Sequence, residues 1–450
     1  MIEKHAAEEW DILMQPDDKV YKNYLQILKE ELVPATGCTE PIAVAYAAAK
    51  AREVLGTLPE SCVIAASGNI IKNVKSVIVP NTNGMKGIAA AAAAGIVAGD
   101  ASQKLEVLSD IREADKAQIQ SYINEHELIV VPADNDMVFY IAATVKYGNE
   151  EVTVVIEHFH TNIALITRNG IKLYESGASG KVNESHGLTD RSCLNIRDIL
   201  DFIQSVRMED ISEVIGRQID YNTAISAEGL KDNWGANIGK VLLSACGNDV
   251  RTRARAAAAA GSDARMGGCE KPVVIVSGSG NQGMTASLPV IEYAKELHAS
   301  QDKLYRAVAL SDLVTIYQKT GIGRLSAYCG AVSAGCGAGA GIAYLYGGDY
   351  DVIAHTIVNA VAITSGIICD GAKPSCAAKI SAAVDAGIFG YYMYEHNQQF
   401  LDGDGIVTKG VDNTIHNVGA LAQKGMRQTD REIIRIMLRK TGKPGIAAKD

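Results

Sequence analysis

The first strongly patterned segment of the chain, residues 20–33, has apolar residues three, four and seven positions apart. This spacing places them on one face and predicts an amphipathic helix that Pro34 ends. A turn with the sequence PATGCTEP follows at residues 34–41. After it, the Ala-rich segment 42–55 predicts a second helix, with Thr39 as its N-cap and a proline in its first turn.

Residues 62–169 carry short apolar runs bounded by turn residues, a pattern typical of β-strands. The runs expected to form strands are residues 63–67, 76–79, 128–131, 137–146, 152–157 and 163–167. Gly148-Asn149 between two of them is a hairpin signal, so these strands are predicted to form an antiparallel meander. The Ala-rich segment 87–99 interrupts the strands and predicts a helix packed across the sheet.

Beyond Arg197 the periodicity becomes mainly helical. The segments expected to form helices are residues 199–207, 211–222, 239–246, 251–260, 304–319, a Gly/Ala-rich helix from 325, 352–368 and 377–386. One clear strand, residues 273–277, interrupts them. For the last helix, Thr429 and Glu432 predict a capping box, and Gly442 with Pro444 predict its end.

These patterns together predict an α+β fold in two domains. Residues 1–190 are expected to form an α+β domain with an antiparallel sheet, helices and the PATGCTEP turn. Residues 191–450 are expected to form a mainly helical domain, and the boundary is placed between residues 185 and 197.

The composition fits a folded protein that does not bind nucleic acid. Of 450 residues, 43 are Lys or Arg and 52 are Asp or Glu, which gives a net charge of −9. Nucleic-acid-binding proteins normally present a basic patch instead. Hydrophobic residues make up 47% and charged residues 21%, so the composition also excludes a disordered or fibrous chain.

Two segments bear on cellular location. Residues 1–18 carry acidic residues and lack the basic and apolar regions of a secretory signal, so a cytoplasmic protein is expected. Residues 325–346 are uncharged over a length that could cross a bilayer. Their Gly, Ala and Ser residues insert poorly into lipid, so a buried helix is expected there and no membrane association. Helices rich in small residues also suit close subunit packing, which leaves a homo-oligomer open as an expectation.

The glycine-rich segment Gly278–Gly283 (GSGNQG) follows a predicted strand and precedes a helix. Its spacing matches a dinucleotide fingerprint, but the segment after Asp302 has helical rather than strand periodicity, which argues against nucleotide binding. Backbone N–H groups at such a helix start favour an anion, so a substrate carboxylate is expected there. The candidate substrate-binding residues are Gly280, Asn281, Gln282 and Gly283. A tight turn that binds nothing is the open alternative.

The nine cysteines are unlikely to form structural disulfides in a reducing compartment. Cys369 and Cys376 flank Gly371 and Pro374, which let the chain curl round a metal cluster. Cys329 and Cys336 have the same spacing in a helical segment, so only one of them is expected to reach the same centre. No cysteine pair has the short spacing of a zinc site, and widely spaced cysteines fit an iron–sulfur cluster better. Buried structural cysteines remain the alternative.

Cys38 is a separate case, because it lies just before the helix predicted from residue 42. The positive end of the helix dipole is expected to favour its thiolate. The remaining thiols, Cys62, Cys193, Cys246 and Cys269, belong to no motif and are interpreted as packing residues.

Five short motifs occur in a specific order along the chain. They are PATGCTEP at 34–41, SDARMGG at 262–268, SGSGNQG at 277–283, RLSA at 324–327 and CDGA at 369–372, the last followed by Ser375-Cys376. With these motifs the chain resembles the L-cysteine desulfidase family, which is related to the alpha chain of iron–sulfur L-serine dehydratases. The resemblance spans residues 20–440, nearly the whole chain.

The resemblance implies an oxygen-sensitive [4Fe-4S] cluster held by Cys329, Cys369 and Cys376, with Cys336 as a bystander. It implies that Cys38 is catalytic, as the candidate base for the substrate α-proton, although a role as fourth cluster ligand competes with this one. His160-Thr-Asn162 also looks like a family segment, without an assigned role. Unlike some of the serine dehydratases, this sequence has no cysteine in residues 446–450 to close the open iron.

The implied activity is β-elimination of a small amino-acid substrate, L-cysteine, to pyruvate, ammonia and hydrogen sulfide. An open cluster iron would act as a Lewis acid for the leaving group. L-Serine dehydration to pyruvate and ammonia is the first alternative, and a non-catalytic iron–sulfur sensor is the second.

Overall fold

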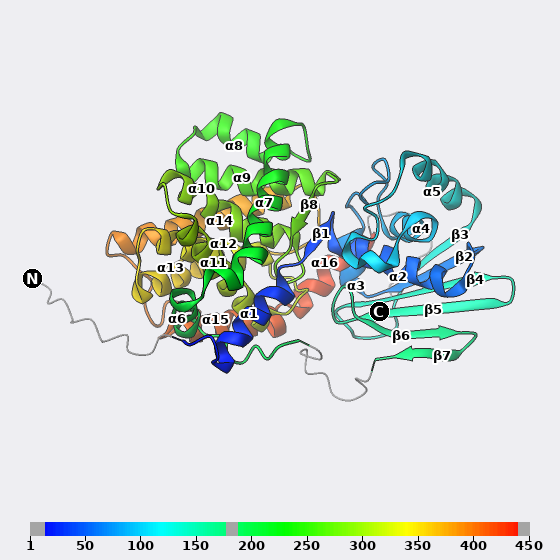
Figure 1. The fold of residues 1–450 in the computed structure, drawn as a ribbon, viewed down its shortest axis with the longest axis horizontal. Helices are drawn as coiled ribbons and strands as arrows, with labels where there is room; N and C mark the ends of the chain where they lie inside the picture. The colour runs from blue at the N-terminus through cyan, green and yellow to red at the C-terminus, as the bar shows by residue number, and fades with distance from the viewer. Residues whose placement is uncertain (1–13, 177–187, 440–450) are drawn as a thin grey trace, which may run out of the picture.

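The computed structural model describes residues 14–176 and 188–439 and has the predicted α+β fold, with a sheet-containing part beside a helical part (Figure 1). The elements up to residue 176 are α1 (Lys19–Glu31), β1 (Pro34–Thr36), α2 (Thr39–Leu55), β2 (Ser61–Ala66), α3 (Gly68–Val74), α4 (Ile88–Ala98), the 3₁₀-helix η1 (Ala101–Glu106), α5 (Glu113–Glu125), β3 (Glu127–Pro132), β4 (Tyr140–Tyr147), β5 (Glu150–Glu157), β6 (Ile163–Arg168) and β7 (Ile171–Glu175).

The larger sheet is mixed rather than wholly antiparallel. Its strand order is β3-β2-β4-β5-β6-β7. β4 to β6 form the predicted antiparallel meander, and β7, which was not predicted, extends it. β2 and β3, in contrast, pair in parallel. The prediction is wrong here because the chain between these strands passes through three α-helices and returns in the same direction, as a parallel crossover requires.

Two local predictions in this region are also wrong. The apolar run at 76–79 forms no strand and only an isolated bridge between Ile78 and Lys86. The helix α3 just before it was not predicted, because the run of β-branched residues in GNIIKNV favours strand in isolation. Tertiary packing decides instead, since α3 is buried along most of its length.

The Ala-rich helices α2 and α4 cover one face of the sheet, as predicted for residues 87–99. Along β2 the side chains alternate, with Cys62, Ile64 and Ala66 buried under these helices. A Cβ atom on Gly95 of α4 would lie 2.2 Å from the carbonyl oxygen of Ala45 in α2. Small residues are therefore needed for the two helix backbones to meet.

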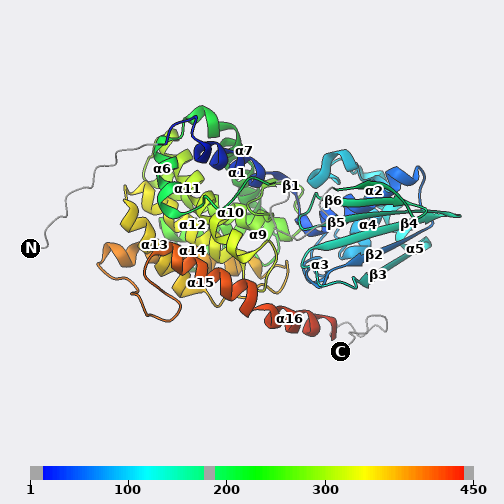
Figure 2. The same cartoon turned by 90° about the horizontal axis from the view of Figure 1, so that it is seen from below.

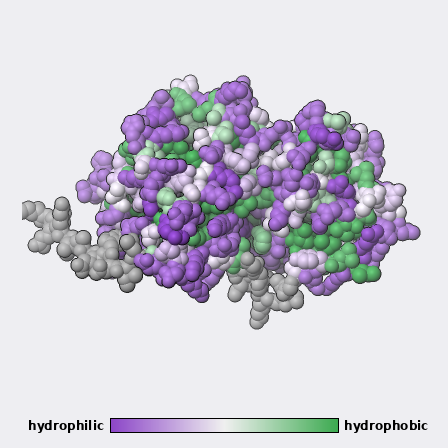
Figure 3. All heavy atoms as spheres, in the orientation of Figure 1, coloured by the Kyte–Doolittle hydropathy of each residue, from purple (hydrophilic) through white to green (hydrophobic). Residues whose placement is uncertain are grey.

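At the open end of the sheet, the edge strand β7 is exposed along its length. Ile171 and Leu173 are 68% and 56% exposed. Hydrophobic side chains gather over this end of the sheet in the space-filling view (Figure 3).

The helical part surrounds a central helix, α12. Its elements are α6 (Ile196–Ser205), α7 (Met208–Lys231), α8 (Ile238–Cys246), α9 (Val250–Met266), β8 (Pro272–Val274), α10 (Gly280–Glu296), α11 (Gln301–Ile322), α12 (Gly330–Leu345), α13 (Tyr350–Thr364), α14 (Cys376–Glu395), α15 (Val411–Ala420), the π-turn η2 (Leu421–Gly425) and α16 (Arg427–Arg439). α12 packs against α10, α11, α13 and α14. Across the described residues, none of the helices combines the length and apolar character that crossing a bilayer would need.

Glycines let α12 approach its neighbours backbone to backbone. A Cβ atom on Gly335 would lie 2.4 Å from the carbonyl oxygen of Ala383 in α14. One on Gly339 would lie 2.6 Å from the carbonyl oxygen of Gly387. The Gly/Ala-rich sequence of this buried helix is thus explained by close packing.

Two predicted helix caps are wrong. Cys38, not Thr39, is the N-cap of α2, and Thr39 is the first residue of the helix. α16 begins at Arg427, so Thr429 lies inside its first turn and cannot cap it. The predicted stop at Gly442 and Pro444 lies outside the described residues.

Both ends of the described chain cross between the two parts. α1 packs against α7 and α11, and α16 runs from the helical part to contact α3 (Figure 2). The predicted boundary at 185–197 lies partly in residues 177–187, which the structure does not describe. The division into domains 1–190 and 191–450 therefore stays a prediction.

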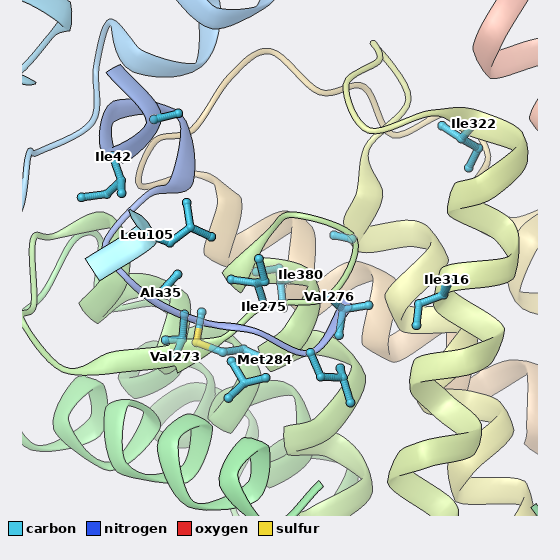
Figure 4. Close-up of a cluster of buried hydrophobic side chains, with 14 of the residues drawn as sticks. Ala35, Ile42, Leu105, Val273, Ile275, Val276, Met284, Ile316, Ile322 and Ile380 are labelled. Atoms are coloured by element: carbon cyan, nitrogen blue, oxygen red, sulfur yellow. The ribbon is translucent and has the colours of Figure 1, made fainter. Parts of the chain in front are cut away.

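The junction itself is apolar. β1 pairs antiparallel with β8 in a two-stranded sheet, with Ala35 opposite Val273. Figure 4 shows both side chains in a buried cluster that also contains Met284 of α10 and Ile380 of α14. Ile380 also lines the pocket described next, so the cluster adjoins this pocket.

Candidate active site

A pocket of about 100 Å³ lies where the two parts meet. Cys38, Glu40, Asn73 and His160 line it from the sheet-containing part. The helical part contributes the remaining residues, among them Arg265, Ser277, Gly278, Ser279, Asn281, Gln282, Lys319, Arg324, Tyr328, Cys329, Cys369 and Cys376.

Four helices start at this pocket. Cys38, Ser279 and Cys329 are the N-caps of α2, α10 and α12, and Cys376 is the first residue of α14. Helix N-termini carry partial positive charge and unpaired N–H groups. Their convergence makes the pocket suited to an anionic occupant.

The three cysteines predicted as cluster ligands, Cys329, Cys369 and Cys376, all line this pocket and form no disulfide. The N–H of Cys369 donates to the carbonyl of Ala327 at 2.6 Å, and the N–H of Cys329 donates to Ile367 at 3.1 Å. These bonds hold the two cysteine-bearing loops side by side. Cys336, in contrast, is buried within α12 and does not line the pocket.

The loop between Cys369 and Cys376 curls as its glycine predicts. Gly371 has φ +93°, and a Cβ atom there would lie 2.4 Å from the carbonyl oxygen of Lys72. Asp370 in the same loop is paired with Lys373 and with Lys379 of α14. The loop is therefore held against Lys72 on one side and by Lys379 of α14 on the other.

The donor set fits a cluster better than a single ion. Within residues 14–176 and 188–439, no three His, Cys, Asp or Glu side chains are placed to hold one metal ion. An iron–sulfur cluster does not need that convergence, because each thiolate binds a different iron atom. The three free cysteines that line the pocket are the type of donor that such a cluster takes.

The Cys38 side chain is only 1% exposed, and its Sγ lies 3.8 Å from the sulfur of Met266. Burial raises the pKa of Cys38 to about 12, although the nearby charge of Arg265 acts in the opposite direction. Burial therefore opposes the thiolate that the helix N-terminus is predicted to favour.

Glu40, in the first turn of α2, is a site residue that the sequence reasoning did not single out. Asn73 donates to its Oε1 at 3.2 Å, and the Nε2 of His160 lies 3.9 Å from the same oxygen. Burial acts to raise the pKa of Glu40, but attraction to His160 and Arg265 outweighs it and lowers the pKa. The site thus holds a buried carboxylate suited to a ligand ammonium group.

His160 was noted in the sequence without a role, and the structure places it on the pocket wall. Its ring is 4% exposed and packs edge-on against Phe139, with ring centroids 4.8 Å apart. Gly278 makes room for it: a Cβ atom at this position would lie 3.0 Å from His160 Cε1 and 3.1 Å from Arg324 Nη1.

Two of the four predicted substrate-binding residues line the pocket, Asn281 and Gln282. Gly280 and Gly283 serve packing: a Cβ atom on Gly280 would lie 2.6 Å from Arg265 Nε, and one on Gly283 would lie 2.0 Å from the carbonyl oxygen of Val274. The preceding β8 pairs only with the antiparallel β1, which agrees with the rejection of a dinucleotide fold.

Three cationic side chains line the pocket, and the sequence reasoning assigned a role to none of them. Arg265 donates to Gly37 and Asn281, and Arg324 pairs with the buried Glu31. Burial lowers the pKa of Lys319 to about 8, against the influence of Cys369 and Cys329. The SDARMGG and RLSA motifs carried a signal for both arginines, whereas Lys319 lies in an ordinary helical pattern.

Several buried polar atoms of the pocket wall have no hydrogen-bond partner among the described residues. They are His160 Nε2, Gln282 Oε1, Tyr328 Oη and Asn73 Oδ1. Buried polar groups are rarely left unpaired in proteins. The pocket is therefore built to surround a polar ligand.

Comparison with known proteins gives one family match and several close relatives. The family described as serine dehydratase alpha chain matches residues 102–435, which include every cysteine of the pocket except Cys38. A UPF0597 protein of Desulfitobacterium hafniense is 58% identical over 427 residues, which cover 95% of this chain and 99% of that protein. UPF0597 proteins of Lachnoclostridium phytofermentans and Treponema denticola are 49% and 45% identical, over 93% and 95% of this chain and 100% of each relative.

Proposed function

Because the chain belongs to the serine dehydratase alpha chain family, we propose that it is an iron–sulfur lyase that cleaves L-cysteine to pyruvate, ammonia and hydrogen sulfide. The observation that carries the proposal is the pocket that gathers Cys329, Cys369 and Cys376 together with Cys38. L-Serine is the second candidate substrate, and the family description favours it.

Cys329, Cys369 and Cys376 would hold a [4Fe-4S] cluster. A cluster held by these three cysteines would supply an open iron as a Lewis acid for the β-substituent. The four helix N-termini at the pocket favour the negative charge of the three thiolates. Cys336 has no part in this set.

The substrate is held at its two charged ends. Its carboxylate lies at the start of α10, beside Asn281 and Gln282, where Arg265 supplies a positive charge. Its ammonium group lies at the buried carboxylate of Glu40. Opposite charges at the two ends would orient the amino acid in the pocket that also holds the three cysteines.

Cys38 is the candidate base that removes the α-proton. Its raised pKa makes the thiolate scarce but strongly basic, so substrate binding must bring the sulfur into the charged form. His160, paired with Glu40, is the competing candidate on the same side of the pocket. Loss of the α-proton and the β-substituent leaves aminoacrylate, which tautomerises and hydrolyses to pyruvate and ammonia.

The experiment is pyruvate release under strict anaerobiosis after reconstitution with iron and sulfide, with L-cysteine and L-serine compared side by side. Faster turnover of L-cysteine with matching sulfide supports the desulfidase, and faster turnover of L-serine supports the dehydratase. Cys369→Ala is the control, because it removes a proposed ligand. No pyruvate from either substrate, with the cluster present, overturns the proposal and favours a sensing role.

A further inference from the structure

Lys72 of α3 is a buried cation that connects three segments of the molecule. Its side chain is 1% exposed. The Nζ donates to Asp430 Oδ1 at 2.6 Å and to the carbonyl oxygen of Cys369 at 3.3 Å. One ammonium group thus bridges the C-terminal helix α16 and the loop that carries Cys369 and Cys376.

The same helix touches the loop through its backbone. A Cβ atom on Gly371 would lie 2.4 Å from the carbonyl oxygen of Lys72, so the loop rests directly on α3. Asn73, the next residue of α3, donates to Glu40 in the pocket. α3 therefore supports both the cysteine loop and the buried carboxylate of the site.

α16 closes over the far side of α3 (Figure 2). A Cβ atom on Gly68 would lie 2.8 Å from Cδ1 of Ile434, which shows how closely the two helices approach. Lys75, near the C-terminal end of α3, donates to the carbonyl oxygen of Met437. Lys75 thus contacts α16 without contacting the cysteine loop.

We propose that Lys72 is a positioning residue for the cysteine loop, residues 369–376, and that its pairing with Asp430 makes α16 part of the support of the cluster site. This inference rests on the proposed function. The ammonium group fixes the carbonyl of Cys369, and so the direction of its thiolate, while Asp430 neutralises the buried charge. α16 contributes to cluster retention although none of its residues lines the pocket.

The test compares Lys72→Met with Lys75→Met in the full-length protein, reconstituted anaerobically. Iron release to a ferrous chelator is followed with time, together with the visible circular dichroism of the bound cluster, which reports the conformation of its ligand loop. Lys72→Met is expected to release iron about 10-fold to 100-fold faster, because outer partners of metal ligands affect affinity by that factor. Its circular dichroism is expected to change, whereas Lys75→Met keeps the rate and spectrum of the wild type.

A second variant guards against poor folding. In Lys72→Met the carboxylate of Asp430 loses its partner, so the double variant Lys72→Met with Asp430→Asn removes both charges and is expected to release iron as fast as Lys72→Met. Wild-type rates and spectra in both variants overturn the inference alone. Equal acceleration by Lys75→Met overturns the positioning role of Lys72, because docking of α16 would then explain iron retention without the hydrogen bond to Cys369. A wild-type protein that takes up no cluster overturns the proposed function as well.

Discussion

The Nε of Arg265 donates to the carbonyl oxygen of Gly37 at 3.0 Å, so a side chain from the end of α9 fixes the turn that presents Cys38. Gly37 has φ +70°, and a Cβ atom there would lie 2.7 Å from Cγ of Pro80. The same guanidinium reaches Asn281 at 3.2 Å. Arg265 therefore sets the relative position of the base candidate and the proposed carboxylate site.

Replacing Arg265 by Lys is expected to lower kcat/KM about 10-fold to 100-fold, because a buried charge-assisted hydrogen bond contributes roughly 1.5–3 kcal/mol. Lysine keeps the charge but cannot bond Gly37 and Asn281 together. Steady-state kinetics on reconstituted enzyme measure the effect, with iron content as the control. An unchanged kcat/KM at full iron loading would contradict this role.

Cys329→Ala and Cys336→Ala form a matched pair. Both cysteines belong to α12, Cys329 as its N-cap, but of the two only Cys329 lines the pocket. Cys329→Ala is expected to lose the cluster, and Cys336→Ala to keep it at a stability cost of about 1 kcal/mol for the small cavity. Iron and acid-labile sulfide analysis after reconstitution checks both. A cluster lost only from the Cys336 variant would mean that the ligand set is wrong.

Cys38→Ala is expected to keep the cluster but to lose turnover by about 10²-fold to 10⁴-fold, the range for a removed general base. Exchange of the substrate α-proton with deuterated solvent isolates this step from departure of the leaving group. His160→Gln is the comparison: if this variant alone stops the exchange, His160 is the base. Loss of iron from Cys38→Ala would instead assign Cys38 as a fourth ligand.

Local sequence pattern predicted much of this fold. The Ala run that became α4 and the alternation that became β4 to β6 are both local properties of the chain. The parallel pairing of β2 with β3 was missed, because strand direction depends on the path of the connection. The strand β7 was missed because all its side chains are exposed, so no face of the strand is buried to guide its assignment.

The sequence motifs identified the candidate cysteines of the site, but they could not predict which residues surround these cysteines. The protonation of Cys38 depends on burial by segments distant in sequence, which no local pattern records. Glu40 and His160 are far apart in sequence and meet only through the fold of the sheet-containing part. Lys319 reaches the same pocket only when the helical part packs against that part. The sequence analysis noted the segment His160–Asn162 as similar to the family but assigned it no role.

Gly278→Ala tests the space between His160 and Arg324. The residue has φ +81°, so alanine costs about 1 kcal/mol from the backbone alone. Gly84→Ala is the control, because Gly84 has φ +83° but no atom within 4 Å of its Cβ position. Both variants are expected to lower Tm in thermal melts by a similar amount, because both strain the backbone. Only Gly278→Ala is expected to raise KM as well. Equal KM values in the two variants would show that His160 and Arg324 move aside without affecting substrate binding.

Asp312 of α11 is buried and predicts a pH effect on stability. Burial raises its pKa well above the usual value, and the hydrogen bond from Gln218 only partly opposes this. The folded state therefore binds the proton more tightly, so its contribution is present at low pH and is lost as pH rises through the folded pKa. Asp312→Asn should flatten the decline in the urea midpoint as pH rises above the usual pKa range of an aspartate. Parallel curves for variant and wild type would exclude Asp312 as the cause.

The glycine contacts between α12 and α14 have a consequence for how this protein can change over generations. Cys329 and Cys376 begin these two helices, and Gly335 and Gly387 let their backbones touch further along. The separation of the two proposed ligand sulfurs therefore depends on glycines that do not line the pocket. A methyl group added at Gly335 would lie 2.4 Å from the backbone of α14, so this position is expected to tolerate substitution poorly although it is remote from the site.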